Sequence, residues 1–313
     1  MNLIDITAEF ATEDACLAYL EAMRWPSGVA CLKCGSLKVK RLNPTDKRGK
    51  TRRVYQCLER PCLHQFTATT GTIFHDTHLP LRTWFIAIAL ICDAKKGTSA
   101  CQLQRHLPGS KKGQKMSYRT AWYLCHRIRK AMEEGPLPKF TGIVEADETY
   151  VGGKYDRRRK RGPWEKPGAV GIMERGGKIV AKPIKTPSAM VLTGIVRDRV
   201  APEAQMVVTD QLAAYKGLKK VYRHEVINHI REYVRGKVHT NSVENFWSLL
   251  KRGIMGSYHK VSIRHLPRYL AEFTYRFNRR EEQEQLFAET TRNLLRGERL
   301  PYKTLTASQV SES

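Results

Sequence analysis

Two close pairs of cysteines lie near the start of the chain. "CLKC" contains Cys31 and Cys34, and "CLERPC" contains Cys57 and Cys62. Both spacings let the two thiolates of a pair reach one tetrahedral ion, and four sulfur ligands suit Zn²⁺. We therefore predict a zinc module, with four reduced core cysteines or one redox pair as the alternatives. Because the second pair is wider than the common two-residue gap, His64 stays open as a replacement for Cys62.

The segment between the two pairs supports this prediction. "GSLKVKRLNPTDKRGKTRRVYQ" is polar, basic and rich in turns, with short strand-like pieces such as "RRVYQ". Its few apolar residues could not build a core alone, so zinc would supply folding energy. The other four cysteines occur singly in apolar helical patterns and are predicted to be small core residues. They are Cys16, Cys92, Cys101 and Cys125.

Acidic residues form the second group that could do chemistry. Asp210 is expected to end a short apolar strand, Asp147 lies on an earlier predicted strand, and Glu244 lies on a later predicted helix. An acid at the end of a buried strand is where α/β folds place chemistry, although a single one is usually a turn residue. Carboxylates that folding brings together repel one another, and a pair of divalent cations offsets that repulsion. Hard oxygen ligands indicate Mg²⁺ or Mn²⁺ at this second site.

The helix "VHTNSVENFWSLLKRG" is the clearest of these elements. Its apolar residues form one stripe at about 100° per residue. They are Val243, Phe246, Trp247, Leu250 and Ile254. Glu244 and Lys251 fall together on one flank of the stripe, so Glu244 could bind a metal while Lys251 holds a substrate phosphate. Asn241 lies further round the helix and is a weaker candidate.

The pattern around these acids predicts a β-rich region after residue 136. The first strand, 142–153, carries Glu145 and Asp147 on one face and Glu148 on the other. Residues 169–185 are predicted to form two strands joined by a Gly-Gly hairpin, and "VLTGIVRDR" continues the β-rich stretch. "HEVINH" is predicted to be a further strand. Whether Glu145, Glu148, His239 or Asn241 assists the other acids stays open.

A helical segment precedes this region. "LRTWFIAIALICDA" is apolar nearly all round and is predicted to be a buried helix. Residues 98–107 and 117–132 are predicted to be two capped helices, the second one basic, which is compatible with a helix-turn-helix unit that binds DNA. A plain helical bundle is the alternative, because the connection 108–116 is longer than the usual turn.

Charge indicates the class of partner. The chain has 313 residues, 55 Lys and Arg against 30 Asp and Glu, a formal net charge of +25 and a pI near 9.9. Dense basic runs such as "KYDRRRKRGPWEK" and "PGSKKGQK" favour a protein that binds nucleic acid over one that is merely basic. No apolar run is long enough to cross a membrane, and no signal peptide is recognised, so we expect a soluble, cytoplasmic protein.

The motifs together resemble a known family. "EADETYVGGK", "VVTDQLAAYKGL" and "HTNSVENFWSLLKRGIMGSYHKVSIRHLPRYLAEFTYRFNRR" are similar to the ISXO-type transposases of bacterial insertion sequences, a family related to Merlin-type elements. "CLKCGS", "YQCLERPCLHQFTATTGTIFHDT" and "TAWYLCHRIRKAM" resemble that family's zinc ribbon and following helical segment. The resemblance covers nearly the whole chain. The sequence departs from the pattern at the wide second cysteine pair and at the basic insertion "SKKGQK".

The resemblance implies an α/β fold with an RNase H-like catalytic core, a mixed sheet flanked by helices, preceded by the zinc ribbon and helical segment. It implies a DDE triad of Asp147, Asp210 and Glu244, with Lys251 as the basic residue seven positions after Glu244. The predicted segments are 1–28 (helical), 29–78 (zinc ribbon), 79–135 (helical, DNA-binding), 136–300 (catalytic) and 301–313 (flexible tail). The implied metals are Mg²⁺ or Mn²⁺ at the triad and structural Zn²⁺ at Cys31, Cys34, Cys57 and Cys62.

The same resemblance implies the activity. One metal would activate water to cut a DNA strand, and the freed 3′-OH would attack target DNA at the same site. The implied partners are terminal inverted repeats, target DNA and, on DNA, further copies of the chain, all at the bacterial nucleoid. Predicted DNA contacts are Arg157, Arg158, Arg159, Lys160, Arg161, Arg119, Arg127, Lys251 and Arg252. The alternatives are a metal-dependent nuclease without strand transfer and a non-catalytic DNA-binding remnant.

Overall fold

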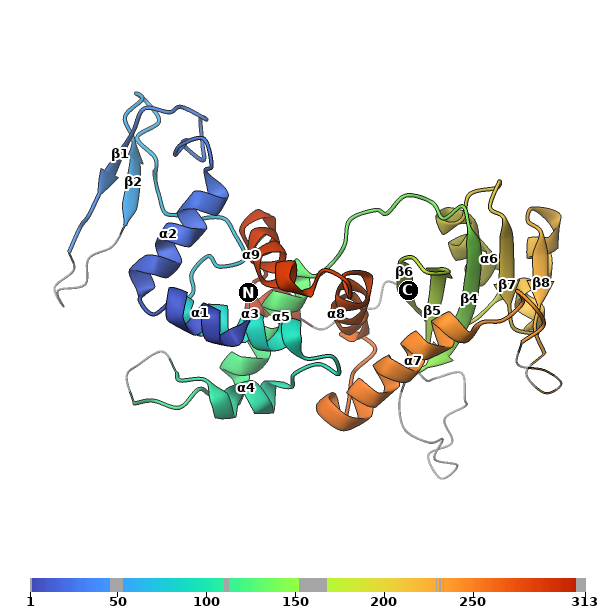
Figure 1. The fold of residues 1–313 in the computed structure, drawn as a ribbon. Helices are drawn as coiled ribbons and strands as arrows, with labels where there is room; N and C mark the ends of the chain where they lie inside the picture. Colours follow the sequence, from blue (N-terminus) through green and yellow to red (C-terminus); the bar gives the residue numbers. More distant parts are fainter. Residues whose placement is uncertain are drawn as a thin grey trace. The chain divides into compact units, whose positions relative to one another are not determined.

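The chain packs into two compact units in a computed structural model (Figure 1). The structure describes residues 2–45, 53–109, 113–151, 168–228, 230, 232 and 234–307. The first unit contains the residues up to 93, then 100–131, and then those from 284 onward; the second contains 94–99 and 132–283. The basic run at 154–166, with the predicted DNA contacts Arg157, Arg158, Arg159, Lys160 and Arg161, lies outside the described residues.

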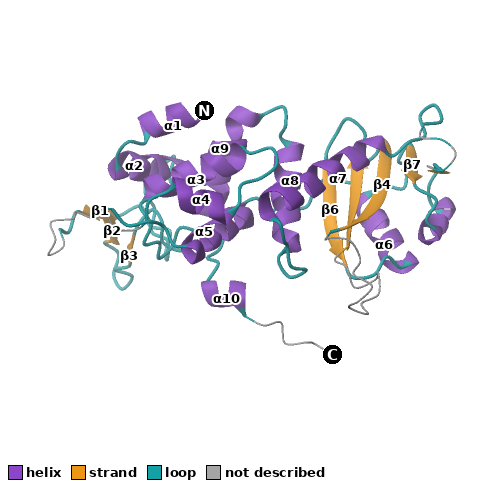
Figure 2. Cartoon of the chain, turned by 90° about the horizontal axis from the view of Figure 1, so that it is seen from below, coloured by secondary structure: helices purple, strands orange, loops and turns teal. Residues whose placement is uncertain are grey.

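Helices make up most of the first unit. They are α1 (Leu3–Glu9), α2 (Glu13–Arg24), α3 (Leu81–Asp93), α4 (Ala100–His106), α5 (Tyr118–Ala131), α9 (Leu286–Arg296) and α10 (Tyr302–Thr306). Helix α3 is central, because α1, α2, α5 and α9 all pack against it (Figure 2). Most of its side chains are buried, including Trp84, Phe85 and Ile88, so the prediction of a buried helix from "LRTWFIAIALICDA" is confirmed.

Capping residues fix where these helices begin. The Asn2 side chain accepts the backbone N–H of Asp5, whose own side chain accepts the N–H of Asn2, and this reciprocal pair starts α1. Thr12 starts α2 by accepting the N–H of Ala15. Helices α4 and α5 pack against each other within the two predicted ranges, but a helix-turn-helix role for them stays a prediction. Cys101 on α4 is exposed, so its prediction as a core residue was wrong.

A three-stranded antiparallel sheet follows α2. Its strands are β1 (Val39–Leu42), β2 (Val54–Cys57) and β3 (Gln65–Phe66), in the order β1-β2-β3. The buried cluster beneath it is small: Tyr55 and Phe66 stack there beside two of the cysteines, with Trp25 packed against them. So small a cluster supports the prediction that a metal supplies part of this module's stability.

The second unit is built on a five-stranded mixed sheet. Its strands are β4 (Ile143–Tyr150), β5 (Gly168–Glu174), β6 (Ile179–Ile184), β7 (Met206–Thr209) and β8 (His224–Val226). The order is β6-β5-β4-β7-β8; β4, β5 and β6 are antiparallel neighbours, whereas β4, β7 and β8 run parallel. An antiparallel meander extended by two parallel strands is the arrangement expected of an RNase H-like core, so the predicted fold class is confirmed.

Helices cover both faces of this sheet. On one face, α6 (Ala189–Arg199) and the 3₁₀ helix η3 (Ala213–Lys220) pack on side chains such as Val144 and Ala146. On the other, α7 (Asn241–Gly253) and α8 (Leu266–Asn278) pack on Ala169 and Met173. The stretch "VLTGIVRDR", which follows the hairpin, is helical and not part of the β-structure, because Ser188 caps it and its apolar residues face the sheet.

Two further features bear on the predictions. The apolar stripe of α7 is buried as expected. Helix α9 packs with the first unit, and the division into five segments stays a prediction. Among the described residues no helix has the length and apolar character that crossing a membrane would require.

Candidate active site

The register of two parallel strands brings two predicted acids level with each other. Ala146 on β4 pairs with Thr209 on β7. The next residue on each strand is an acid, Asp147 on β4 and Asp210 just beyond the end of β7. Parallel strands end at the same edge of a sheet, so both side chains reach the same place. The expectation that strand ends would assemble the acids is met at these two positions.

A third carboxylate, Glu148, joins them. One carboxylate oxygen each from Asp147, Glu148 and Asp210 lies within 4.8 Å of the others. The hydroxyl of Tyr215, a buried residue on η3, donates to Glu148 Oε2 at 2.9 Å. The backbone N–H of Leu212 donates to Asp210 Oδ1 at 3.0 Å. Contacts from the loop and helix after β7 therefore hold two of the three carboxylates.

The acids perturb one another. Burial, together with the nearby carboxylates of Glu148, Asp210 and Glu244, raises the pKa of Asp147 to about 8. Burial and Asp210 also raise the pKa of Glu148, which the hydrogen bond from Tyr215 partly counteracts. A half-buried set of carboxylates that repel one another fits a divalent cation, because the cation's charge offsets both the repulsion and the loss of solvation.

Glu244 lies next to this cluster, in the first turn of α7. It is near enough to raise the pKa of Asp147, but it is not among the carboxylates that lie within 4.8 Å of one another. Its Oε1 accepts the Thr240 hydroxyl at 2.6 Å. The structure thus brings together Asp147, Asp210 and Glu148, whose role the sequence left open. Glu244 lies beside them and is hydrogen-bonded to its own helix terminus.

Glu145 lies on the same face of β4 as Asp147 but makes different contacts. It is fully buried, and its Oε2 accepts the backbone N–H groups of Ser242 at 2.8 Å and Val243 at 3.1 Å. Its Oε1 accepts the Ser242 hydroxyl at 3.0 Å and Arg175 Nε at 2.9 Å. A carboxylate at this position satisfies N–H groups that the first turn of a helix leaves unpaired. Glu145 therefore fixes the start of α7, and with it the turn that carries Glu244.

The sequence left the roles of Glu145 and Glu148 open. The two-residue period of a strand correctly places Glu148 on the face opposite Asp147, toward Tyr215. It does not reveal that Asp210, one residue past the end of β7, is reachable from both faces. The available signal for Glu145 was an acid between the apolar residues Val144 and Ala146 on a predicted strand, because an acid that such a strand buries requires partners.

The remaining predicted DNA contacts differ in exposure. Lys251 and Arg252 are exposed on the last turn of α7, and Arg252 Nε donates to the carbonyl of Ser248 at 3.2 Å. Arg119 on α5 is exposed. Arg127 is only 5% exposed and donates to the carbonyls of Ile73 and His75, which is a structural role. Contact of any of these residues with DNA stays a prediction.

The four cysteines of the two pairs form a second candidate metal centre. Their sulfur atoms lie within 4.8 Å of one another, with Cys31 and Cys62 separated by 3.7 Å and Cys34 and Cys57 by 3.6 Å. Zinc–sulfur bonds of about 2.3 Å in a tetrahedron place sulfur atoms about 3.8 Å apart, so the cluster fits zinc. The ring of His64 is stacked on Phe66, and Cys62 is the fourth member of the cluster.

The surroundings of Cys31 favour its thiolate. Burial opposes ionisation, but backbone N–H groups at Cys34 and Lys33 and the neighbouring thiols lower the pKa of Cys31 to about 6. Burial raises the pKa of Cys57 to about 12. A cluster of thiols that share protons in this way gives them up when a metal binds, since the thiolate is the ligand.

Comparisons with known proteins agree with both centres. Residues 139–278, which include the clustered acids, Glu244 and Lys251, match the ISXO2-like transposase domain. Residues 11–65, which include all four cysteines, match the transposase zinc-ribbon domain. The chain is also similar to a protein of Halobacterium salinarum named as an uncharacterized protein in transposable element ISH50. The two are 29% identical over an alignment of 286 residues, which covers 85% of this chain and 91% of the relative.

Proposed function

We propose that this chain cuts DNA at the ends of its element and joins the freed 3′-OH to target DNA. It carries a transposase zinc ribbon followed by an ISXO2-like transposase domain, and so belongs to the transposases of insertion sequences. The observation that carries the proposal is the cluster of Asp147, Glu148 and Asp210 at the ends of β4 and β7, with Glu244 of α7 beside it. Of these acids we assign Asp147, Asp210 and Glu244 as the catalytic triad.

The triad residues would hold Mg²⁺ or Mn²⁺. When bound, the cation stabilises the negative charge on the attacking and leaving oxygens of a phosphodiester. In the first step a water oxygen forms a bond to phosphorus, and the 3′ oxygen leaves as the 3′-OH of the element end. In the second step that 3′ oxygen forms a bond to a target phosphorus and displaces a new 3′-OH. Each step exchanges one P–O bond for another, so one carboxylate set serves both.

Basic residues would hold the substrate beside the triad. Lys251 is exposed seven residues after Glu244 on the same helix, and it makes no ion pair within the described residues. Its ammonium group is thus available for a DNA phosphate near the acids. The zinc ribbon, with structural Zn²⁺ on its four cysteines, and the helical segment after it would bind the terminal repeats. Several copies of the chain would assemble when the ends are paired.

A joining assay tests this function. Purified protein, Mg²⁺ or Mn²⁺, labelled DNA ends taken from the sequence flanking its gene, and a supercoiled target plasmid are mixed. Wild type is compared with Glu244→Gln and with Glu203→Gln, a matched change at an exposed acid of the same unit. We expect joined product from wild type and Glu203→Gln, and at least a hundredfold less from Glu244→Gln.

The other outcomes assign the alternatives. Cleaved but unjoined DNA from wild type would favour a metal-dependent nuclease with the same core. Binding of the DNA ends without cleavage or joining would favour a non-catalytic DNA-binding protein. Equal joining by Glu244→Gln and wild type would remove Glu244 from the triad.

A further inference from the structure

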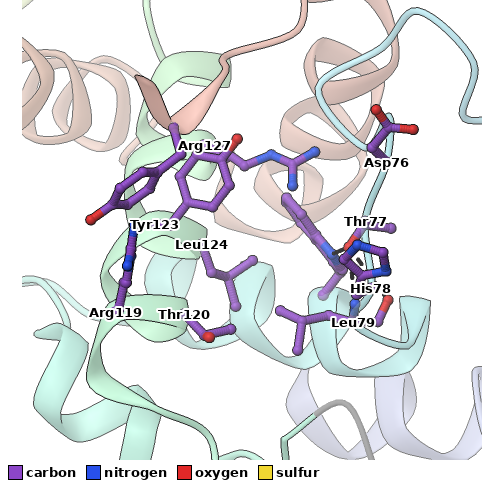
Figure 3. Close-up of a pocket in the computed structure, with 11 residues that line it drawn as sticks. Asp76, Thr77, His78, Leu79, Arg119, Thr120, Tyr123, Leu124 and Arg127 are labelled. Atoms are coloured by element: carbon purple, nitrogen blue, oxygen red, sulfur yellow. Dashed lines mark hydrogen bonds between the residues drawn. The ribbon is translucent and has the colours of Figure 1, made fainter. Parts of the chain in front are cut away.

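A pocket in the first unit is lined by none of the residues that form the two candidate metal centres. Its volume is about 470 Å³, within the range of about 300–1,000 Å³ that is usual for small-molecule sites. Residues of α5 form one side, including Arg119, Tyr123 and Arg127 (Figure 3). Residues 76–79 form another side, and Tyr302 of α10 completes it. We call this the α5 pocket.

Stacked side chains make one wall of the α5 pocket rigid. The guanidinium of Arg127 lies 4.7 Å from the ring centre of Trp84 and 5.2 Å from that of Tyr123. Its N–H groups donate to backbone carbonyls of Ile73 and His75, and the side chain is buried. The indole N–H of Trp84 donates to the Thr77 hydroxyl at 2.8 Å. These contacts fix a planar cation between aromatic rings before any ligand arrives.

A second cation lies at the exposed side of the pocket. The guanidinium of Arg119 is held 4.2 Å from the ring centre of Tyr302, and it forms no ion pair with any carboxylate of the described residues. The pocket's acid, Asp76, is already paired with Arg299 at 2.7 Å. The charges of Arg119 and Arg127 therefore outweigh that of the lining acid, so the α5 pocket suits an anionic ligand.

The lining defines the ligand more closely. Aromatic rings and stacked guanidinium groups bind the face of a nucleic-acid base, and an unpaired arginine binds phosphate. The hydroxyl of Thr120 and the ring of His78 also line the pocket and can bond to the edge of a base. A base within a duplex has both faces stacked and its pairing edge occupied, so only an unpaired nucleotide presents all of these groups together.

We propose that the α5 pocket holds one unpaired nucleotide of the bound DNA, with its base against the partly exposed rings of Tyr123 and Tyr302 and its phosphate on Arg119. The proposal rests on the proposed function only in requiring that the protein binds DNA. Cutting an element end and joining it to a target both create strand ends at which a nucleotide can leave the duplex. A dedicated pocket would hold such an end in place.

A binding measurement tests this without any catalysis. Full-length zinc-loaded protein in EDTA-free buffer without Mg²⁺ is titrated into two fluorescent DNA hairpins, one fully paired and one with a single unpaired 2-aminopurine nucleotide. Anisotropy gives the two dissociation constants, and 2-aminopurine fluorescence reports stacking of the base. We expect wild type to prefer the unpaired probe about tenfold or more, equal to about 1.4 kcal/mol, and to quench its fluorescence.

Variants separate the pocket from general attraction to DNA. Arg119→Ala and Tyr302→Leu are expected to lose most of the preference and of the quenching, while Arg119→Lys keeps part of both. Arg105→Ala, at an exposed arginine of α4 outside the pocket lining, should leave the ratio of the two constants unchanged. Circular dichroism checks folding, and Arg119 is exposed, so its removal does not disturb the core even if Tyr302→Leu does.

Three results would overturn the proposal. They are equal binding of the two hairpins by wild type, an unchanged preference in Arg119→Ala, and tight binding of free deoxyadenosine monophosphate with no preference for the unpaired hairpin. The last would make this a site for free nucleotides. Failure of the joining assay with an intact preference would reject the proposed catalysis and keep the pocket. If wild type shows no preference for the unpaired hairpin but joins DNA normally, the pocket proposal is rejected and the proposed catalysis is kept.

Discussion

The carboxylate of Glu145 accepts the backbone N–H of Ser242 at 2.8 Å and so joins strand β4 to the start of helix α7. Asp147 lies two residues after Glu145 on the strand, and Glu244 lies two residues after Ser242 on the helix. One hydrogen-bonded junction thus positions two acids of the proposed triad from distant parts of the chain. Arg175 is the cation of the junction, at 2.9 Å from Glu145 Oε1, and it also donates to the carbonyl oxygens of Lys237 and His239.

We predict that Glu145→Ala lowers the free energy of unfolding by about 3 kcal/mol, because it leaves buried N–H groups and the Arg175 guanidinium without their acceptor. Glu145→Gln should cost less, since its amide oxygen still accepts. Urea denaturation measures both. Glu203→Ala, at an exposed acid, is the control and should change stability by less than about 0.5 kcal/mol. Equal stability of Glu145→Ala and wild type would show that the junction does not fix α7.

The zinc prediction can be tested at the fourth ligand. Cys62→Ser should reduce bound zinc from about one ion per chain and destabilise the ribbon, because the sulfur of Cys62 belongs to the cluster. His64→Ala should keep full zinc content, since the His64 ring is stacked on Phe66. Zinc is measured by elemental analysis after dialysis. Loss of zinc in His64→Ala with retention in Cys62→Ser would exchange the two assignments.

The acid cluster predicts a specific dependence on pH. Burial, with help from the neighbouring acids, raises the pKa of Asp147 from its ordinary 3.8 to about 8 in the metal-free fold. The folded chain then holds a proton that the unfolded chain loses above about pH 4. This contribution to stability is complete below pH 4 and is lost as the pH rises toward 8, at up to about 1.4 kcal/mol per pH unit.

Divalent cations should reverse that trend, since they compete with the proton. Between pH 6 and 8 we expect the affinity for Mn²⁺ to rise up to about tenfold per pH unit, because binding releases one proton. Calorimetry measures the affinity, and thermal unfolding in EDTA measures the metal-free stability. Asp147→Asn should flatten the dependence of the melting temperature on pH, while Glu203→Gln should not. A flat profile in wild type would mean that Asp147 is ionised in the metal-free protein.

The sequence predicted those parts of the fold that local patterns control. The apolar stripe of α7, the Gly-Gly hairpin between β5 and β6, and an acid ending β7 all follow from periodicity and turn residues. The prediction of β-structure for residues 191–199 was wrong, because an apolar run of that length suits either a strand or a buried helix. The Ser188 cap and packing against the sheet stabilise the helix.

The site was predictable to the extent that strand ends could be recognised. Asp147 and Asp210 meet because of the register between Ala146 and Thr209, which no local pattern specifies. Glu148 is held in the cluster by a hydrogen bond from Tyr215, which is 67 residues away in the sequence. Arg127 donates to backbone carbonyls of a segment more than 50 residues earlier. Such long-range contacts depend on tertiary packing, so composition and spacing could not reveal them.

Lys251 provides the last prediction. It is exposed in the final turn of α7, about 10.5 Å along the helix axis from Glu244 at about 1.5 Å per residue. If its ammonium binds a DNA phosphate, Lys251→Ala should reduce joining roughly tenfold to a hundredfold, the loss of one charge-assisted contact, and leave Mn²⁺ affinity unchanged. It should also reduce the number of counterions released on DNA binding by about one, as measured from the slope of log affinity against log salt concentration. Lys260→Ala, at another exposed lysine of this unit, controls for net charge. If the two variants lose joining equally, Lys251 acts only through the protein's overall charge, because a contact at one phosphate would make its loss larger and specific to that position.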